Sequence, residues 1–255
     1  KKYLELKETM FAGATEPKEI RGTPLPAANF YNLNGQYKEA LKDYKDLISM
    51  RPSNGTNYVF AANISSKLGN DKEALRYYSE AIRSGKNDTG TYNNIGNALL
   101  GLGKPMEAKG YFLKSLELLP NNQYPLAMLG LLEYRVFNNQ TEAFVKADQA
   151  ILNQRKSSVS FMARGYLNLY CGYYDDAKSD FDKALAFKNE FFSFTGMANY
   201  EVANHSFKEA LTYAQQAVNI ATESDLPKAN NLLAYVNYKL GDIEKSKFNY
   251  QLSFD

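Results

Sequence analysis

The side chains that most often carry catalysis are few in this sequence. His205 is the only histidine and Cys171 the only cysteine among 255 residues. A metal site with several histidines is therefore excluded, and any Ser-His or Cys-His pair would have to use this one imidazole. His205 stands at a predicted turn, and we interpret it as a solvated turn residue. Cys171 ends a predicted helix beside Gly172; we interpret it as a buried packing residue, with no internal disulfide possible.

Aspartates gather in one segment and would be the best candidates to bind a cation: Asp175, Asp176, Asp180 and Asp182. Lys178 and Lys183 stand among them at helical spacings, so a solvated helix with ion pairs explains the cluster better than a metal site. Glycines serve as turn residues, and no GxxxxGK[ST] loop that would hold phosphate occurs. We therefore predict no enzymatic activity, no catalytic or metal site and no cofactor.

Composition excludes two further classes of protein. Lys plus Arg number 30 and Asp plus Glu 28, a formal net charge of +2, whereas nucleic-acid binding needs clustered excess base. No apolar run approaches the roughly 18 residues of a transmembrane segment, and the first ten residues lack the apolar core of a signal peptide. The sequence does not begin with Met, which leaves a leader or larger upstream region open. We expect a soluble protein, cytoplasmic or periplasmic, with no nucleic-acid partner.

Residues 91–120 contain the complete set of elements that recurs along the chain. Apolar or small residues in their first part have the three- and four-residue spacing of one helix face: Tyr92, Ile95, Gly96 and Leu99. Gly103 ends this helix, because glycine can take the left-handed conformation, and Pro105 suits the first turn of the next. The inner face of that second helix is formed by Ala108, Phe112 and Ser115. The stretch therefore predicts two short helices joined by a tight turn.

The same pattern repeats in independent registers. The small residue of the first helix recurs at intervals of 33 to 36 residues, at Ala28, Ala62, Gly96, Gly130, Gly165, Ala198 and Ala234. The alanine of the second helix recurs as Ala40, Ala74, Ala108, Ala143, Ala177 and Ala210, and then as Ser246. A later position reads Tyr44, Tyr78, Phe112, Ala147, Phe181, Ala214 and Tyr250. This agreement indicates seven helix pairs in a single array with no internal domain boundary.

This arrangement resembles the tetratricopeptide repeat, a helix-turn-helix unit of 34 residues with aromatic, small and turn residues at set offsets. The resemblance covers residues 21–255. It implies an all-α fold, a right-handed α-α superhelix in which each repeat buries its apolar face against its neighbours. Residues 1–20 fit either the second helix of a degenerate preceding repeat or a loosely docked tail.

In proteins of this family the first helices line the concave face, and the residues there bind peptide segments. Carried over through the repeat register, the resemblance implies a peptide-binding set made of Asn63, Asn93, Asn94, Asn97, Tyr124, Met128, Leu131, Tyr134, Arg135, Met162, Tyr166, Tyr170, Phe192, Asn199 and Tyr235. The same inward face holds Lys67, Asn231, Tyr238 and Lys239. Amides can pair with a peptide backbone, while Tyr and Met offer adaptable apolar pockets, so the implied ligand has apolar anchors. The alternative is that a tyrosine near a helix boundary only packs against the next repeat.

One subclass of the family clamps the C-terminal carboxylates of chaperones. Asn63 and Asn94 fall at its two asparagine positions. Its basic positions, however, hold Val59, Tyr124 and Met128. Without those cations the charge-assisted bonds are lost, and we predict no tight binding to an acidic chaperone tail.

The resemblance implies a non-catalytic scaffold that holds a partner peptide in its concave groove, within a multiprotein assembly such as a secretion, pilus or envelope complex. Two alternatives stay open, a structural subunit that self-associates through uncapped array ends and a regulatory region of a longer protein. Tyr250 and Leu252 would leave apolar surface on the last helix, because no polar capping helix follows. We expect this C-terminal end to make a contact.

Overall fold

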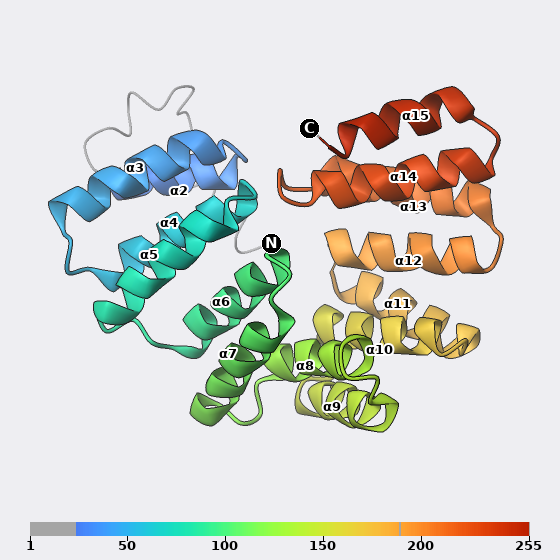
Figure 1. The fold of residues 1–255 in the computed structure, drawn as a ribbon, viewed down its shortest axis with the longest axis horizontal. Helices are drawn as coiled ribbons and strands as arrows, with labels where there is room; N and C mark the ends of the chain where they lie inside the picture. The colour runs from blue at the N-terminus through green and yellow to red at the C-terminus, as the bar shows by residue number, and fades with distance from the viewer. Residues whose placement is uncertain (1–23, 189, 255) are drawn as a thin grey trace. The chain divides into compact units, whose positions relative to one another are not determined.

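The structure is a computed structural model that describes residues 24–188 and 190–254. Within these ranges the chain forms fourteen α-helices and no strand (Figure 1). The helices come in pairs joined by short turns, as the repeat pattern predicts. The prediction for residues 1–20 lies outside the described residues. Contacts divide the described chain into two compact units.

The first unit comprises the described residues up to Leu68 together with Glu73–Lys86. Its helices are α2 (Pro24–Leu33), α3 (Tyr37–Met50), α4 (Gly55–Lys67) and α5 (Asp71–Arg83). α2 packs on α3, and α3 packs on α4. The core between them is formed by Ala28, Ala40, Leu41, Tyr44, Ala61 and Ile64.

The second unit comprises residues 69–72 and 87–254. Its helices are α6 (Thr89–Gly101), α7 (Pro105–Leu118), α8 (Gln123–Arg135), α9 (Gln140–Asn153), α10 (Ser158–Tyr170), α11 (Tyr174–Phe187), α12 (Phe191–Ala203), α13 (Phe207–Ile220), α14 (Leu226–Lys239) and α15 (Ile243–Leu252). The stretch from 91 to 120 therefore forms the helix pair that its spacing predicts. An uninterrupted array over residues 21–255 stays a prediction.

The turns within the helix pairs need a residue with positive φ, and the predicted glycines supply it. The φ angles lie between 69° and 82° at Gly35, Gly69, Gly103, Gly172 and Gly241. Asn138 and His205 replace glycine in two pairs, with φ of 52° and 60°. The interpretation of His205 as a solvated turn residue is confirmed, since it is exposed at this turn. Cys171 is only partly buried at the end of α10, less than expected.

Side-chain caps start several first helices. The capping residues of α4, α6, α8 and α10 each accept a hydrogen bond from a backbone N–H of the first turn: Asn54, Asp88, Asn122 and Ser157. Such a cap contributes about 1 kcal/mol to helix stability. These four polar residues lie in the loops between repeats, and they define where the four helices begin.

The interior of each pair contains the residues of the predicted registers. The alanines of the second helices are fully buried at Ala40, Ala74, Ala108, Ala143, Ala177 and Ala210. Close approach requires glycine at some first helices, because a Cβ at Gly96 would lie 2.6 Å from the ring of Phe112. The last aromatic of the register differs from the others, since Tyr250 is 52% exposed.

First helices of the second unit contact one another directly. α10 contacts α8 and α12, and α12 contacts α14. Among the closely packed helix pairs of the described residues, none joins two second helices. Successive repeats therefore approach each other more closely through their first helices than through their second helices. In a curved stack, the helices that approach most closely lie on the inner side of the curve. Within this unit the first helices therefore form the inner layer.

Candidate functional site

Three tyrosines form a stacked cluster on α8 and α10, here called the tyrosine stack (Tyr134, Tyr166 and Tyr170). The ring of Tyr134 stacks on that of Tyr170 with centroids 5.8 Å apart and an interplanar angle of 12°. Tyr170 in turn stacks on Tyr166, with centroids 5.8 Å apart. Tyr170 is 45% exposed, so this first-helix face presents an aromatic ring to solvent.

Tyr166 anchors the stack to the two helices that follow. Its hydroxyl lies 3.2 Å from Thr195 Oγ1 of α12. The edge of its ring meets Phe181 of α11, with centroids 5.2 Å apart. Burial raises the pKa of Tyr166 to about 12, so the hydroxyl is neutral near neutral pH. The tyrosine stack is therefore held by neighbouring repeats.

Two predicted amides bond to other parts of the same face. Asn97 of α6 accepts a hydrogen bond from the hydroxyl of Tyr124 of α8 at 2.9 Å, and burial raises the pKa of Tyr124. Asn199 donates to the backbone oxygen of Thr195 at 2.8 Å. Asn93 is buried, and its Oδ1 has no hydrogen-bond partner in the described part of the chain. Asn97 and Asn199 therefore use part of their hydrogen-bonding capacity within the fold.

The remaining predicted residues differ in exposure. The exposed ones are Arg135, Phe192 and Tyr235, and Lys239 Nζ lies 5.4 Å from the ring centroid of Tyr235. The partly buried ones are Asn94, Met128 and Leu131, whereas Met162 is buried. Contact of these side chains with a partner stays a prediction.

In the first unit, two predicted inward residues are engaged in the fold. Asn63 Oδ1 accepts a hydrogen bond from the hydroxyl of Tyr78 at 2.6 Å. Lys67 Nζ donates to Asn32 Oδ1 at 2.9 Å and lies 5.0 Å from the ring centroid of Tyr37. Burial lowers the pKa of Lys67. Both side chains therefore hold helices of this unit together.

Arg164 of α10 is a residue that the helical spacings of the sequence do not reveal. Its Nε and Nη2 donate to the two carboxylate oxygens of Asp180 of α11, both at 2.8 Å. Its Nη1 donates to Asp148 of α9 at 2.8 Å, and Asn168 donates to Asp180 at 3.0 Å. One guanidinium therefore bridges three helices.

The expectation of a solvated aspartate cluster is wrong for Asp180, which is only 1% exposed. An arginine from the neighbouring helix neutralises it, and that partner is 16 residues away in sequence. The expectation holds for the exposed pair of Lys178 and Asp182, which lie 2.8 Å apart. Helical spacing in the sequence reveals only partners on the same helix, whereas Arg164 lies on α10 and Asp180 on α11.

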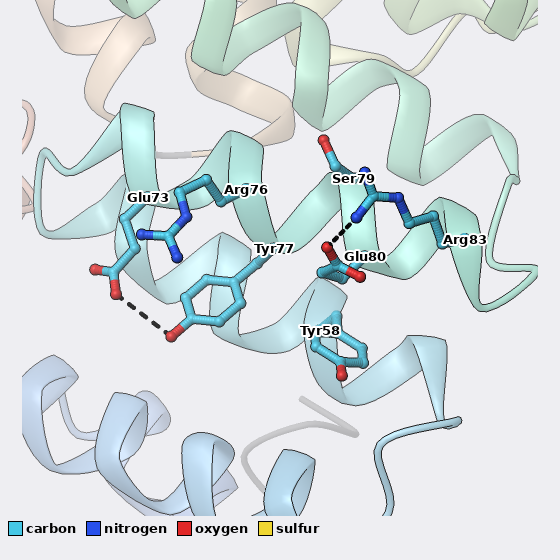
Figure 2. A pocket seen from close by; sticks show the side chains of 7 residues that line it. All are labelled: Tyr58, Glu73, Arg76, Tyr77, Ser79, Glu80 and Arg83. Carbon is cyan, nitrogen blue, oxygen red and sulfur yellow. Dashed lines mark hydrogen bonds and ion pairs between the residues drawn. The ribbon is translucent and has the colours of Figure 1, made fainter.

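A hollow of about 320 Å³ lies on the first unit, outside the predicted set. Figure 2 shows Tyr58 of α4 and, from α5, Glu73, Arg76, Tyr77, Ser79, Glu80 and Arg83 around it. Both of its carboxylates form ion pairs, because Glu73 meets Lys45 of α3 at 3.2 Å and Glu80 meets Arg83. Exposed charges that are already paired indicate a polar surface hollow rather than a binding site for a charged ligand.

The described residues hold no group of three or more His, Cys, Asp or Glu side chains placed to bind a metal ion. A search of the same residues for a helix long and apolar enough to cross a membrane finds none.

Comparison with known families gives a match for two of the helix pairs. The model of the tetratricopeptide repeat family matches residues 27–54 and 89–122. These ranges fall on α2 with α3 and on α6 with α7. A comparison with curated protein sequences finds no match.

Solved structures resemble the chain over most of its length. The Cut9–Hcn1 hetero-tetramer of the APC/C matches with a TM-score of 0.68 and 13% identity over 98% of this chain and 49% of that one. A tetratricopeptide repeat protein from Parabacteroides merdae matches with a TM-score of 0.59 and 17% identity, over 91% and 98% of the two chains. PilW, a type IV pilus biogenesis factor, matches with a TM-score of 0.59 and 19% identity, over 77% and 91%.

The chain thus spans about half the length of the Cut9–Hcn1 chain that it matches. At such identities these structures show a shared fold. The matched repeats, the seven helix pairs and these structures agree, and they confirm the prediction of an all-α repeat fold. Residues 27–54 and 89–122 match the tetratricopeptide repeat family, and the fold of the described chain is that of a tetratricopeptide repeat array.

Proposed function

We propose that this chain is a non-catalytic scaffold that binds a segment of a partner protein on the first-helix face of its second unit. Tetratricopeptide repeats are typically protein-interaction modules. The observation that carries the proposal is the tyrosine stack, which exposes Tyr170 on a face held by three successive repeats. The proposed setting is a multiprotein assembly.

The chemistry of the stack suits an apolar anchor on the partner segment. Aromatic rings that are already packed lose little conformational freedom on binding, and they offer a large flat contact area. Arg135 is exposed beside Tyr134. Its charge acts to lower the pKa of Tyr166, against the larger effect of burial. A partner segment with an apolar or proline anchor followed by a hydrogen-bond acceptor would satisfy both groups.

Further predicted contacts flank the stack. Asn97 and Tyr124 lie on α6 and α8, before the stack, and Phe192 and Asn199 lie on α12, after it. Phe192 is 49% exposed, so it offers a second apolar contact. We propose that an extended segment crosses these helices and anchors at the tyrosine stack.

The test is affinity capture from native cell extract with the chain and with a double variant, Tyr170→Ser with Arg135→Gln. Both side chains are exposed, so the variant should keep its thermal unfolding midpoint within a few degrees. A matched control is Leu152→Ser, which removes an apolar side chain that is 69% exposed on the second helix α9. We expect a protein that is retained by the chain and by the control and lost with the double variant.

Calorimetry with fragments of that protein then measures the loss directly. We expect at least a tenfold weaker affinity for the double variant, because one aromatic anchor and one charged contact are removed. Equal affinity of all three proteins for the same fragment would refute the proposed site.

A further inference from the structure

Three second helices of the second unit carry a lysine as their fifth residue. These are Lys109 in α7, Lys178 in α11 and Lys247 in α15. In the first two cases another repeat follows, and its first helix packs against the helix that carries the lysine. The surroundings of Lys109 and Lys178 therefore show what this position faces inside the array.

Lys109 forms an ion pair with a buried glutamate of the following first helix, and the charge of Lys178 acts on another such glutamate. Lys109 Nζ lies 2.9 Å from Glu133 Oε1 of α8, whose side chain is 8% exposed. Lys178 lies close enough to Glu201 of α12 for their charges to interact, and Glu201 is likewise buried. Burial raises the pKa of Glu201, while a hydrogen bond with Ser206 and the charge of Lys178 act to lower it. Each glutamate is the eleventh residue of its helix.

The lysine and the glutamate occur together. α9 has Phe144 as its fifth residue, and α10, which follows it, has Asn168 as its eleventh. α3 has Leu41, and α4 has Ser65 at the matching place. A glutamate that must be buried between repeats thus appears in these pairs only where a lysine stands opposite, as the cost of burying a lone carboxylate requires.

Lys247 lies among exposed apolar side chains of α15 and of the turn that follows it, here called together with them the α15 stripe (Ile243, Lys247, Tyr250 and Phe254). Ile243 is 44% exposed and Phe254 is 73% exposed. The ring of Tyr250 meets that of Phe254 edge to face, with centroids 4.9 Å apart. Lys247 Nζ lies 3.4 Å from Glu244 Oε1 of its own helix, in an exposed pair of low stability.

The internal repeats show what covers such a stripe. Phe181 of α11 occupies the register place of Tyr250 and is fully buried. The following first helix lies directly over it, since a Cβ added at Gly196 of α12 would stand 2.6 Å from its ring. Lys178 also holds a carboxylate of its own helix, Asp182, while it faces the next repeat. Pairing with Glu244 of its own helix therefore does not prevent Lys247 from facing a carboxylate of another helix.

We propose that the α15 stripe is a docking surface for a helix of a partner protein that carries one glutamate among apolar residues, set against Lys247 as Glu133 is set against Lys109. The lysine gives the surface its specificity, because a purely apolar helix would leave its ammonium group buried without a counter-charge. A symmetric contact between two copies centred on this stripe would bring two Lys247 ammonium groups together, and this disfavours a second copy. This surface is separate from the one that carries the tyrosine stack.

The chain supplies a probe for this surface. Asp255 follows the start of α15 by the same number of residues as Glu117 follows the start of α7. A copy of residues 118–153 appended after Asp255 therefore places a second copy of α8 and α9 in the register that follows α7. In the appended copy, the residue equivalent to Glu133 faces Lys247 if the proposal is right.

The experiment measures urea unfolding of the extended chain in a double-mutant cycle. We expect Glu133→Gln in the appended copy to raise the unfolding equilibrium constant about tenfold, and to leave this constant unchanged or lower it when Lys247→Met is also present. The exchanged pair, Lys247→Glu with Glu133→Lys in the appended copy, should recover most of the loss. The same effect of Glu133→Gln with and without Lys247→Met would overturn the proposal.

Sedimentation of the chain without the extension tests whether a second copy covers the stripe instead. A mass independent of concentration is expected for a surface that binds a different protein. A dimer that Lys247→Glu dissociates would show that a second copy covers the stripe, and the proposed partner helix would then be wrong.

Discussion

The two units hold the aromatic residue between their paired helices in different ways. In the first unit this residue is a tyrosine that donates a hydrogen bond across the pair. The hydroxyl of Tyr44 donates to Asn29 at 2.8 Å, and that of Tyr78 donates to Asn63 at 2.6 Å. A neutral hydrogen bond with fixed direction sets the spacing of the helices there.

In the second unit two positions of the same register, Phe112 and Phe181, hold phenylalanine that packs against glycine. Phe112 lies against Gly96, and Phe181 lies between Gly165 and Gly196 of two successive first helices. The absence of a Cβ on these glycines lets the ring reach the backbone. One repeat position can therefore be closed by a directed polar bond or by close packing, with different tolerance to substitution.

The units also differ in buried charge. The second unit buries Asp180 against Arg164 and Glu133 against Lys109. The two aromatic positions of the first unit are closed by neutral hydrogen bonds. Loss of a single charged partner should therefore be more harmful in the second unit than loss of a hydroxyl in the first.

The largest expected effect comes from Arg164→Met in the second unit. This change leaves Asp180 buried without its arginine, and breaking a buried ion pair typically costs about 3–5 kcal/mol. Urea unfolding followed by circular dichroism measures the loss. The control is Asp182→Asn, which removes an exposed pair and should cost less than about 1 kcal/mol. Equal losses for the two variants would contradict the buried role of Asp180.

A second variant separates the charge from the packing of the arginine. Adding Asp180→Leu to Arg164→Met removes the unpaired carboxylate and should recover part of the lost stability. Greater destabilisation by the double change than by Arg164→Met alone would show that Asp180 stabilises the fold through its other contacts.

An intermediate effect is expected for Gly196→Ala, which tests close packing in the second unit. The added methyl group would stand 2.6 Å from the ring of Phe181, and overpacking of this kind costs about 1–3 kcal/mol. The matched control is Gly110→Ala on α7, where a Cβ meets no atom within 4 Å. Alanine should stabilise that helix by about 0.5–1 kcal/mol, so the two shifts in unfolding midpoint should have opposite signs.

The smallest effect is expected for Tyr78→Phe in the first unit, which removes the hydroxyl that bonds Asn63. The loss of one neutral hydrogen bond should cost about 1 kcal/mol. Tyr250→Phe is the control, because this tyrosine holds the same register position but is half exposed. A shift as large for Tyr250→Phe as for Tyr78→Phe would refute the hydrogen-bond account of the first unit.

Much of the candidate site follows from the repeat register. The register assigns Tyr134, Tyr166 and Tyr170 to first helices, and the structure brings them together. It also assigns Asn63 to the inward side of its own first helix, yet this side chain accepts a hydrogen bond from Tyr78. A register gives the face on which a residue lies, but it does not show whether a neighbouring repeat already uses that residue.

The helix pairs, their turns and the buried alanines can be read from the residues alone, because they depend on spacings of three to four residues and on the backbone freedom of glycine. The folded chain was needed to show that Arg164 neutralises Asp180, 16 residues away, and that Tyr134 contacts Tyr170, 36 residues away. Such contacts cross between helices, and their geometry depends on the angle at which neighbouring helices pack. That angle results from all the side chains between the helices and is not encoded at any single position.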